Sequence, residues 1–370
     1  MTRRPGGRRG VPTLDGVLSA RQCRATAAAI AAVQLPGGAI PWFPGGHTDP
    51  WDHVQNAMAL TAAGRLAAAG RAYRWCARAQ RPDGSWAARY TGDDAQEVAD
   101  PSTDANFCAY LATGVWHYWL VTRDRGFVAR MWPVVRRAIG AVLDLQALGG
   151  QVYYARDPAG ALRPEALVTG NASIHLSLRC AIALAELAGE LVPEWELAAA
   201  RVRHALVRHP ERFADKSRYS MDWYYPVLGG VLAGAAATAQ FESRWDDFVV
   251  TGLGIRCVAD APWVTGAETC ELALALDAAG RPDRARAQLA AMQHLRHDDG
   301  SYWTGLVFTD GKNWPVEQTT WTGATVILAA DALSRTTGGS GLFRGEGLAG
   351  LPAVTGPYAD EEVCSCPATR

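Results

Sequence analysis

Acidic residues stand at the start of several apolar helical segments of the sequence, and they are the side chains best suited to carry chemistry. Asp49 and Asp52 lie in GGHTDPWDH, Asp104 lies in PSTDANF and Glu268 lies in WVTGAETCE. None of these stretches contains a Lys or Arg that would neutralise its carboxylates. Two carboxyl groups across a cleft can hydrolyse a glycosidic bond, because a protonated one assists the leaving oxygen while an ionised one activates water. The sequence therefore predicts an acidic catalytic cleft.

Roles within this cleft can be assigned from the neighbours of each acid. Glu268 is predicted to be the general acid, because Trp263 shortly before it could desolvate its carboxyl group and raise its pKa. Asp49 is predicted to be the general base, at the roughly 6.5–9.5 Å separation that water attack with inversion requires. A proline follows Asp49, an arrangement equally typical of a helix N-cap, so Asp52 is the alternative base if Asp49 only caps.

Aromatic residues with a polar group accompany these acids in the long loops. The chain has 14 Trp and 11 Tyr against 8 Phe. A flat ring with an apolar face and an N–H suits a sugar, although a single Trp more often belongs to a core. The predicted sugar-binding residues are His47, Trp42, Trp51, Asp104, Asn106, Asp222, Trp223, Tyr224, Trp263, Glu271, Trp303, Trp314 and Glu317.

Two kinds of helical segment must position these residues. Segments with one polar face are predicted at 13–34, 65–80, 127–146, 194–208 and 284–296, and segments apolar on every side at 52–66, 104–121, 173–187, 223–237, 268–277 and 319–333. Long loops always precede the apolar segments, and loops this long are usually functional. About six helix pairs in a closed ring, with the apolar helices inside, satisfy this pattern. The predicted fold is an all-α (α/α)6 toroid whose inner helices begin at one rim.

The composition of the chain limits its possible partners, location and cofactors. The 370 residues carry a formal charge of −1, which gives no reason to expect nucleic-acid binding, and no apolar run approaches the roughly 20 residues that cross a membrane. Eight scattered cysteines favour a reducing, cytoplasmic location. Cys364 and Cys366 alone make an incomplete metal site, so no metal or cofactor is expected. The predicted domains are a flexible basic leader at 1–12, one catalytic domain at 13–340 and a polar tail at 341–370.

Three stretches of sequence resemble known families. QRPDGSW at 80–86 and the looser QHLRHDDGSY at 293–302 resemble the QW repeat of squalene and hopene cyclases, which is typical of α/α toroids. DPSTDANFCAYLATGVWHYWLVTRD at 100–124 resembles the six-hairpin glycosidases of the glucoamylase and trehalase type.

Nearly the whole chain resembles actinobacterial proteins often labelled prenyltransferase-like, a group associated with hydrolysis of mycobacterial methylmannose polysaccharide. This last resemblance implies an inverting endo-α-mannosidase whose partner is an oligo- or polysaccharide. An isoprenoid cyclase or prenyltransferase-like toroid and a non-catalytic sugar-binding toroid are the alternatives. Oligomeric state is left open.

Overall fold

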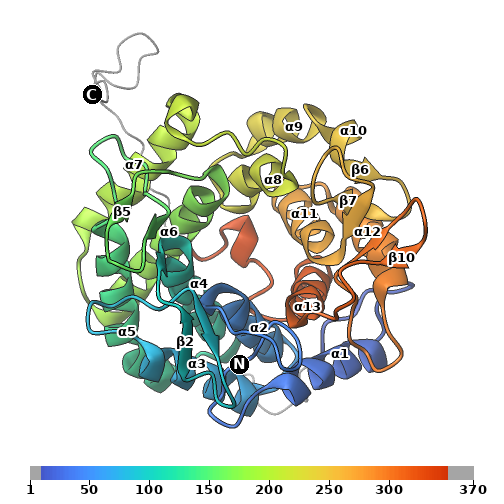
Figure 1. Ribbon diagram of the computed structural model, residues 1–370, viewed down its shortest axis with the longest axis horizontal. Helices are drawn as coiled ribbons and strands as arrows, with labels where there is room; N and C mark the ends of the chain where they lie inside the picture. Colours follow the sequence, from blue (N-terminus) through green and yellow to red (C-terminus); the bar gives the residue numbers. More distant parts are fainter. Residues whose placement is uncertain (1–9, 349–370) are drawn as a thin grey trace, which may run out of the picture.

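Six buried helices form a closed ring in the computed structural model, which describes residues 10–348 (Figure 1). Each contacts the next in chain order, and the last contacts the first. The inner helices are α2 (Pro50–Ala62), α4 (Ala105–Thr122), α6 (Val168–Ala188), α8 (Ser220–Leu228), α11 (Gly266–Ala278) and α13 (Thr320–Ser334). Their side chains are almost all buried, which confirms the prediction that segments apolar on every side lie inside.

A second layer of helices surrounds the ring and turns a polar face to solvent. It consists of α1 (Ala20–Val33), α3 (Leu66–Ala79), α5 (Arg125–Leu143), α7 (Pro193–Arg208), α9 (Gly234–Glu242) and α12 (Pro282–Ala291). Short helical pieces complete the helical part: α10 (Trp245–Phe248), η1 (Pro210–Arg212), η2 (Met292–Leu295) and η3 (Leu342–Arg344). The protein is therefore mostly helical, as the sequence predicted.

The prediction of an inner helix over 223–237 is wrong in its bounds, because the observed helix is shorter. Helix α8 ends at Leu228, and the chain then crosses to the outer layer, where α9 begins at Gly234. The helix ends because Gly230 adopts a left-handed backbone conformation (φ +70°), and the N–H groups of Val231 and Leu232 donate back to the carbonyl of Pro226. Gly229 itself approaches α6 closely, since a Cβ on it would lie 2.1 Å from the carbonyl oxygen of Ala172. Two adjacent glycines are a helix-stop signal in the sequence, which the pattern of apolar residues alone does not include.

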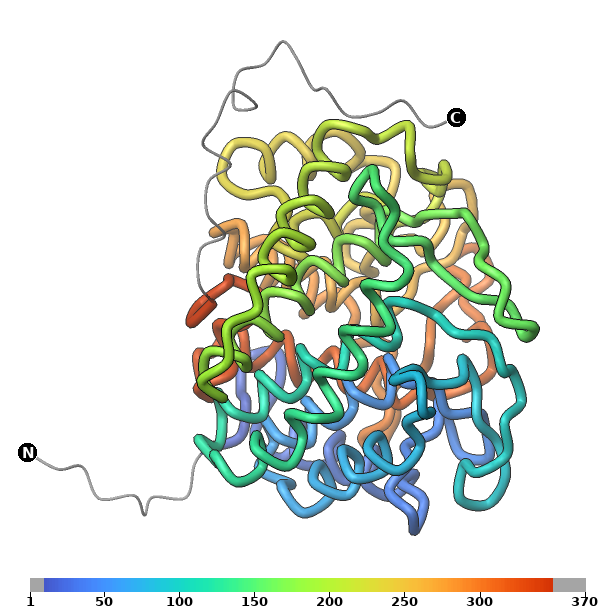
Figure 2. Tube along the Cα trace, turned by 90° about the vertical axis from the view of Figure 1, so that its left-hand side faces the viewer, coloured from blue at the N-terminus to red at the C-terminus, as the bar shows by residue number. Residues whose placement is uncertain are grey.

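Long loops connect outer helices to inner ones and gather at the end of the ring where the inner helices begin (Figure 2). Backbone hydrogen bonds tie these loops together; the N–H of Thr320, for example, donates to the carbonyl of Trp42 at 2.8 Å and joins the starts of α13 and α2. The loops also contain more strand than expected. A five-stranded antiparallel sheet has the order β10 (Lys312–Asn313), β9 (Gly305–Val307), β8 (Trp263–Thr265), β7 (Gly254–Arg256) and β6 (Val249–Val250).

Two smaller sheets complete the rim. One pairs β1 (Arg89–Thr91) with β2 (Glu97–Asp100), and the other joins β3 (Thr103–Asp104), β4 (Ala155–Arg156) and β5 (Leu162–Arg163). All these strands are two to four residues long. The sheets therefore fix the loops relative to one another and so hold the rim residues in place.

Residues 335–348 cover the opposite end of the ring, and the η3 segment lies within it in Figure 1. Leu342 and Phe343 are buried in the core. Both Arg335 and Arg344 pair with Asp277 at the end of α11, at 2.7 and 2.6 Å. The division predicted at residue 340 stays a prediction, because most of the leader (1–12) and of the tail (341–370) lies outside the described residues.

The buried Asp277 should hold this covering segment on the ring. Its side chain is only 2 % exposed, so Asp277→Asn leaves two arginines without their shared counter-charge, and we expect a loss of about 3 kcal/mol in the free energy of unfolding in urea. Glu346, which pairs with Arg344 but is 63 % exposed, provides the control. Glu346→Gln should cost less than about 1 kcal/mol; equal losses in the two variants would contradict this account.

Candidate active site

Two aspartates at the start of α2 form the first part of the acidic site. Asp49 is the N-cap of the helix, and its Oδ1 accepts a hydrogen bond from the backbone N–H of Asp52 at 2.9 Å. Both side chains are nearly buried. Burial, followed by the charge of Asp49 and a hydrogen bond to it, raises the pKa of Asp52 well above its usual range. This shift favours the protonated form of Asp52, which can donate to the Asp49 carboxylate.

Glu268 approaches this pair from the first turn of α11. Its side chain is 6 % exposed, and burial raises its pKa. The Cys257 thiol lies beside it, since burial and then the charge of Glu268 raise the pKa of that thiol. Glu268 and Glu271 also contribute to the raised pKa of Asp52, so carboxyl groups of α2 and α11 share one electrostatic environment. The predicted acid Glu268 thus lies within electrostatic range of Asp52, which is hydrogen-bonded to Asp49.

Glu271 lies one turn further along α11 and is fully buried. The hydroxyls of Tyr224 and Tyr225 donate to its carboxylate at 2.7 and 2.9 Å, and the side-chain amide of Gln55 donates at 3.0 Å. Burial raises the pKa of Glu271 to about 7 although these three donors lower it. Gln55 also donates to Tyr110 at 3.1 Å, so the network connects α2, α4, α8 and α11 beneath the acids.

A hollow of about 420 Å³ opens at the Asp49–Asp52 pair and is lined by Trp42, His47, Trp51 and Asp104 as well. Asp104 caps α4, accepting from the N–H groups of Asn106 and Phe107, and burial raises its pKa to about 7. A second hollow of about 290 Å³ shares Trp51, Asp104 and Phe107 with the first and adds Asn106 and Asp222. The two hollows form one groove along the rim.

The predicted residues Trp42 and His47 line the first hollow, and the predicted residue Glu317 contacts Trp42. The Trp42 indole N–H donates to the Glu317 carboxylate at 3.0 Å, and the rings of Trp42 and His47 stack with centroids 5.9 Å apart. Trp51 lies at the centre, with its ring 5.8–6.3 Å from the rings of Phe107, Tyr110, Tyr225 and Trp321. These aromatic rings come from four inner helices, α2, α4, α8 and α13.

Other predicted sugar-binding residues lie away from the acids or face elsewhere. Trp223 packs on Phe248 of the outer layer and donates to the Gln240 carbonyl at 2.7 Å. The Tyr224 hydroxyl donates to Glu271. Trp303 packs against His297 on the outer side of the ring. Trp263 and Trp314 form an edge-to-face pair on the rim sheet, with ring centroids 4.7 Å apart.

Several groove residues were not identified from the sequence. Gln55, Tyr110 and Tyr225 support Glu271, and Arg89 and Tyr154 line the hollow at Asp49. Tyr225 adjoins two residues that were identified, in SMDWYYP, so proximity was one available signal. The others lie in loops or inside a helix, where no neighbouring sequence motif indicates a function.

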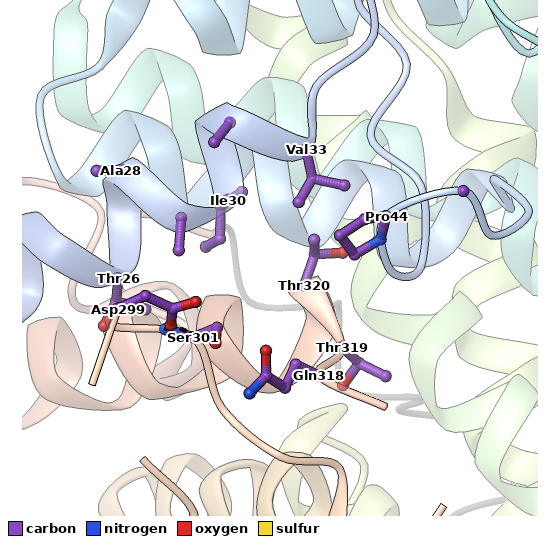
Figure 3. Close-up of a pocket in the computed structure, with 14 residues that line it drawn as sticks. Thr26, Ala28, Ile30, Val33, Pro44, Asp299, Ser301, Gln318, Thr319 and Thr320 are labelled. Atoms are coloured by element: carbon purple, nitrogen blue, oxygen red, sulfur yellow. Dashed lines mark hydrogen bonds between the residues drawn. The ribbon is translucent and has the colours of Figure 1, made fainter. Parts of the chain in front are cut away.

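A larger hollow, of about 580 Å³, lies between α1 and the start of α13 (Figure 3). Its lining is mainly small and aliphatic, including Ile30, Val33 and Pro44, and contains no aromatic side chain. Its single carboxylate, Asp299, already accepts from Ser301 and pairs with His297. Size alone therefore does not identify the site; the clustered acids and aromatic rings do.

The fold is shared with enzymes that act on sugars. A glycosidase variant solved with glucose matches with a TM-score of 0.68 at 17% identity, over 85% of this chain and 96% of that one. A GH63 mannosylglycerate hydrolase from Thermus thermophilus matches at 0.65 and 16%, over 82% and 99%. A D-mannose isomerase matches at 0.63 and 10%, over 85% and 97%. At these identities the likeness shows the fold alone.

A much stronger likeness is to an enzyme of Mycolicibacterium hassiacum, the MMP endo-(1,4)-3-O-methyl-α-D-mannosidase. The two are 62% identical over 338 residues, which cover 91% of this chain and 93% of that enzyme. No family model matches the sequence. The chain belongs to the family of this mannosidase and is a glycoside hydrolase. Among residues 10–348, no helix is both long and apolar enough to cross a membrane.

The raised pKa of Glu271 should make stability depend on pH. Because its pKa is about 7 in the folded protein and 4.5 ordinarily, the folded state holds the proton more tightly, and stability falls as the pH rises from about 4.5 to about 7. In Glu271→Gln this part of the fall should disappear, a difference of about 3 kcal/mol in urea unfolding between the two pH values. Glu186→Gln, which changes an exposed acid of α6, should behave as the wild type does. Parallel curves for wild type and Glu271→Gln would contradict the assignment.

Proposed function

We propose that this protein cleaves α-(1,4) bonds within a polysaccharide of 3-O-methylmannose, on an (α/α)6 six-hairpin toroid. The observation that carries the proposal is the 62% identity with an endo-mannosidase of that specificity, which extends over nearly the whole chain. The acidic groove supports it independently, because carboxyl groups from two inner helices meet beside aromatic faces. An isoprenoid cyclase would instead need an apolar lumen, which these carboxyl groups disfavour.

In the proposed mechanism, Glu268 is the general acid. Burial raises the pKa of its carboxyl group, which favours the protonated form that a general acid needs to assist the leaving oxygen. Asp49 is the general base, because burial raises the pKa of its neighbour Asp52 and so favours the neutral form of that partner. Attack by water from the Asp49 side, with departure assisted from the Glu268 side, inverts the anomeric configuration.

The proposed sugar-binding and supporting residues follow from the same contacts. Trp42, Trp51, His47, Asp104 and Asn106 would hold sugars along the groove. Asp222, Trp263, Trp314 and Glu317 would extend the binding surface, while Glu271 and Tyr224 support the acids from below. The six cysteines within the described residues are all free, which supports a cytoplasmic location.

Replacement of the acid should separate protonation from binding. Glu268→Gln should lower kcat on methylmannose polysaccharide by about 10²–10⁴-fold, because the leaving oxygen receives no proton. An aryl oligomannoside with a dinitrophenolate leaving group needs no protonation, so the variant should cleave it at close to the wild-type rate. Equal losses on both substrates would show that Glu268 is not the acid.

The two aspartates should differ as bases. Asn caps a helix as well as Asp does, so Asp49→Asn keeps the start of α2 but should lower kcat by about 10²–10⁴-fold on both substrates. Asp52→Asn retains a hydrogen-bond donor toward Asp49 and should lose about tenfold or less. The reverse order of losses would identify Asp52 as the base. Proton NMR of the first product should show the inverted anomer.

A further inference from the structure

The second hollow of the groove has walls unlike those of the first. Alongside Phe107, which both hollows share, Leu167, Ile174 and Met221 line it, so much of its surface is carbon. It adjoins the acidic pair, because Trp51 and Asp104 line both hollows. A sugar residue next to the one at the acids would therefore place one of its edges against this apolar surface.

Asn171, Thr169 and Asp222 line this hollow and already have hydrogen-bond partners within the protein, while Lys216 and Tyr219 are exposed to solvent. Asn171 accepts from the N–H of Val152 at 2.7 Å and donates to the carbonyls of Val152 and Leu167 at 2.9 and 3.0 Å. The Thr169 hydroxyl donates to Asp222 at 2.6 Å. A sugar hydroxyl pressed against the apolar part of the wall, formed by Phe107, Leu167 and Met221, would lose its hydrogen bonds to water without replacement, whereas a methyl ether would lose very little.

Asn106 differs from Asn171, Thr169 and Asp222, because its side-chain oxygen has no hydrogen-bond partner among the described residues. It is only 8 % exposed, it lines the hollow, and its side-chain oxygen is buried without a hydrogen bond from any residue between 10 and 348. A buried amide oxygen of this kind requires a donor, and a sugar hydroxyl can supply one. Asn106 would thus hold one hydroxyl of the sugar and fix which edge of the ring faces the apolar wall.

Gly170 provides the space. It lies in the first turn of α6, where a Cβ would meet only the Cβ atoms of Asn106 and Leu167, each at 3.9 Å, an ordinary contact. The fold therefore does not require glycine here, and glycine within a helix costs about 0.5–1 kcal/mol relative to alanine. The absence of a side chain at Gly170 is then explained by the space that it leaves for a ligand in the wall of the hollow.

We propose that the hollow over Gly170 is a methyl-ether subsite, which selects a 3-O-methylated mannose next to the cleaved bond. Asn106 orients that sugar, and the wall formed by Phe107, Leu167 and Met221 receives the methyl group. The inference rests on the proposed function, and it assigns the preference for methylated sugar to particular residues.

Filling the hollow tests the proposal. Wild type should cleave α-(1,4)-linked 3-O-methylmannose oligosaccharide with a kcat/KM about 10–200-fold above that for the unmethylated oligosaccharide of equal length, the discrimination that one methyl group provides. Gly170→Leu should lose tenfold or more on the methylated substrate and much less on the other, so the preference collapses. Gly140→Leu is the matched control, because Gly140 is exposed on outer helix α5 with nothing within 4 Å of an added Cβ. It should behave as the wild type does.

The possible outcomes are distinguishable. If Gly170→Leu keeps the wild-type preference, the subsite is wrong while the proposed function stands. If wild type releases reducing ends from neither oligosaccharide, the proposed function itself fails, and the subsite with it. Gly170→Ala provides a variant that should unfold at the same or a higher temperature than wild type, and it should lose part of the preference. An unchanged preference in both Gly170 variants overturns the proposal.

Discussion

Carboxyl groups buried close together are the constraint on which the rest of this structure depends. Asp49, Asp52, Glu268 and Glu271 lie where solvent is largely excluded, and like charges there repel strongly. The protein relieves the repulsion in two ways: burial keeps protons on some of the acids, and helix starts or tyrosine hydroxyls stabilise the others. A ring whose inner helices all begin at one rim supplies these helix starts together, which explains how one fold can concentrate so many acids.

Much of the fold could be predicted because inner and outer helices bury different fractions of their surface. Helix α4, apolar all round, and α3, with one polar face, both follow the sequence pattern closely. The prediction failed after Leu228, where the left-handed conformation of Gly230 ends α8. It also missed the rim sheets, because strands of two to four residues are too short to show an alternating pattern.

The candidate site could be predicted in part for a related reason. Asp49, Asp52 and Glu268 stand at helix starts after loops rich in Gly, Pro and Trp, and this position marks them in the sequence. The residues that complete the site lack such a mark. Gln55 contacts Glu271 across 216 residues of chain, and only the closed ring brings them together. Aromatic content likewise could not distinguish Trp51, at the centre of the groove, from Trp223, which packs on the outer layer.

The covered end of the ring bears on how a polymer can be cut. Leu342, Phe343 and Arg344 cover the side opposite the acids, so a polysaccharide has no path through the ring along its axis. It must lie across the rim, and the two adjoining hollows on either side of Trp51 and Asp104 offer such a course. A closed pocket would admit only a chain end, whereas a groove that continues past the acids accepts sugars on both sides of the bond. The shape of the rim, together with the cover beneath it, therefore favours the cleavage within the chain that we propose.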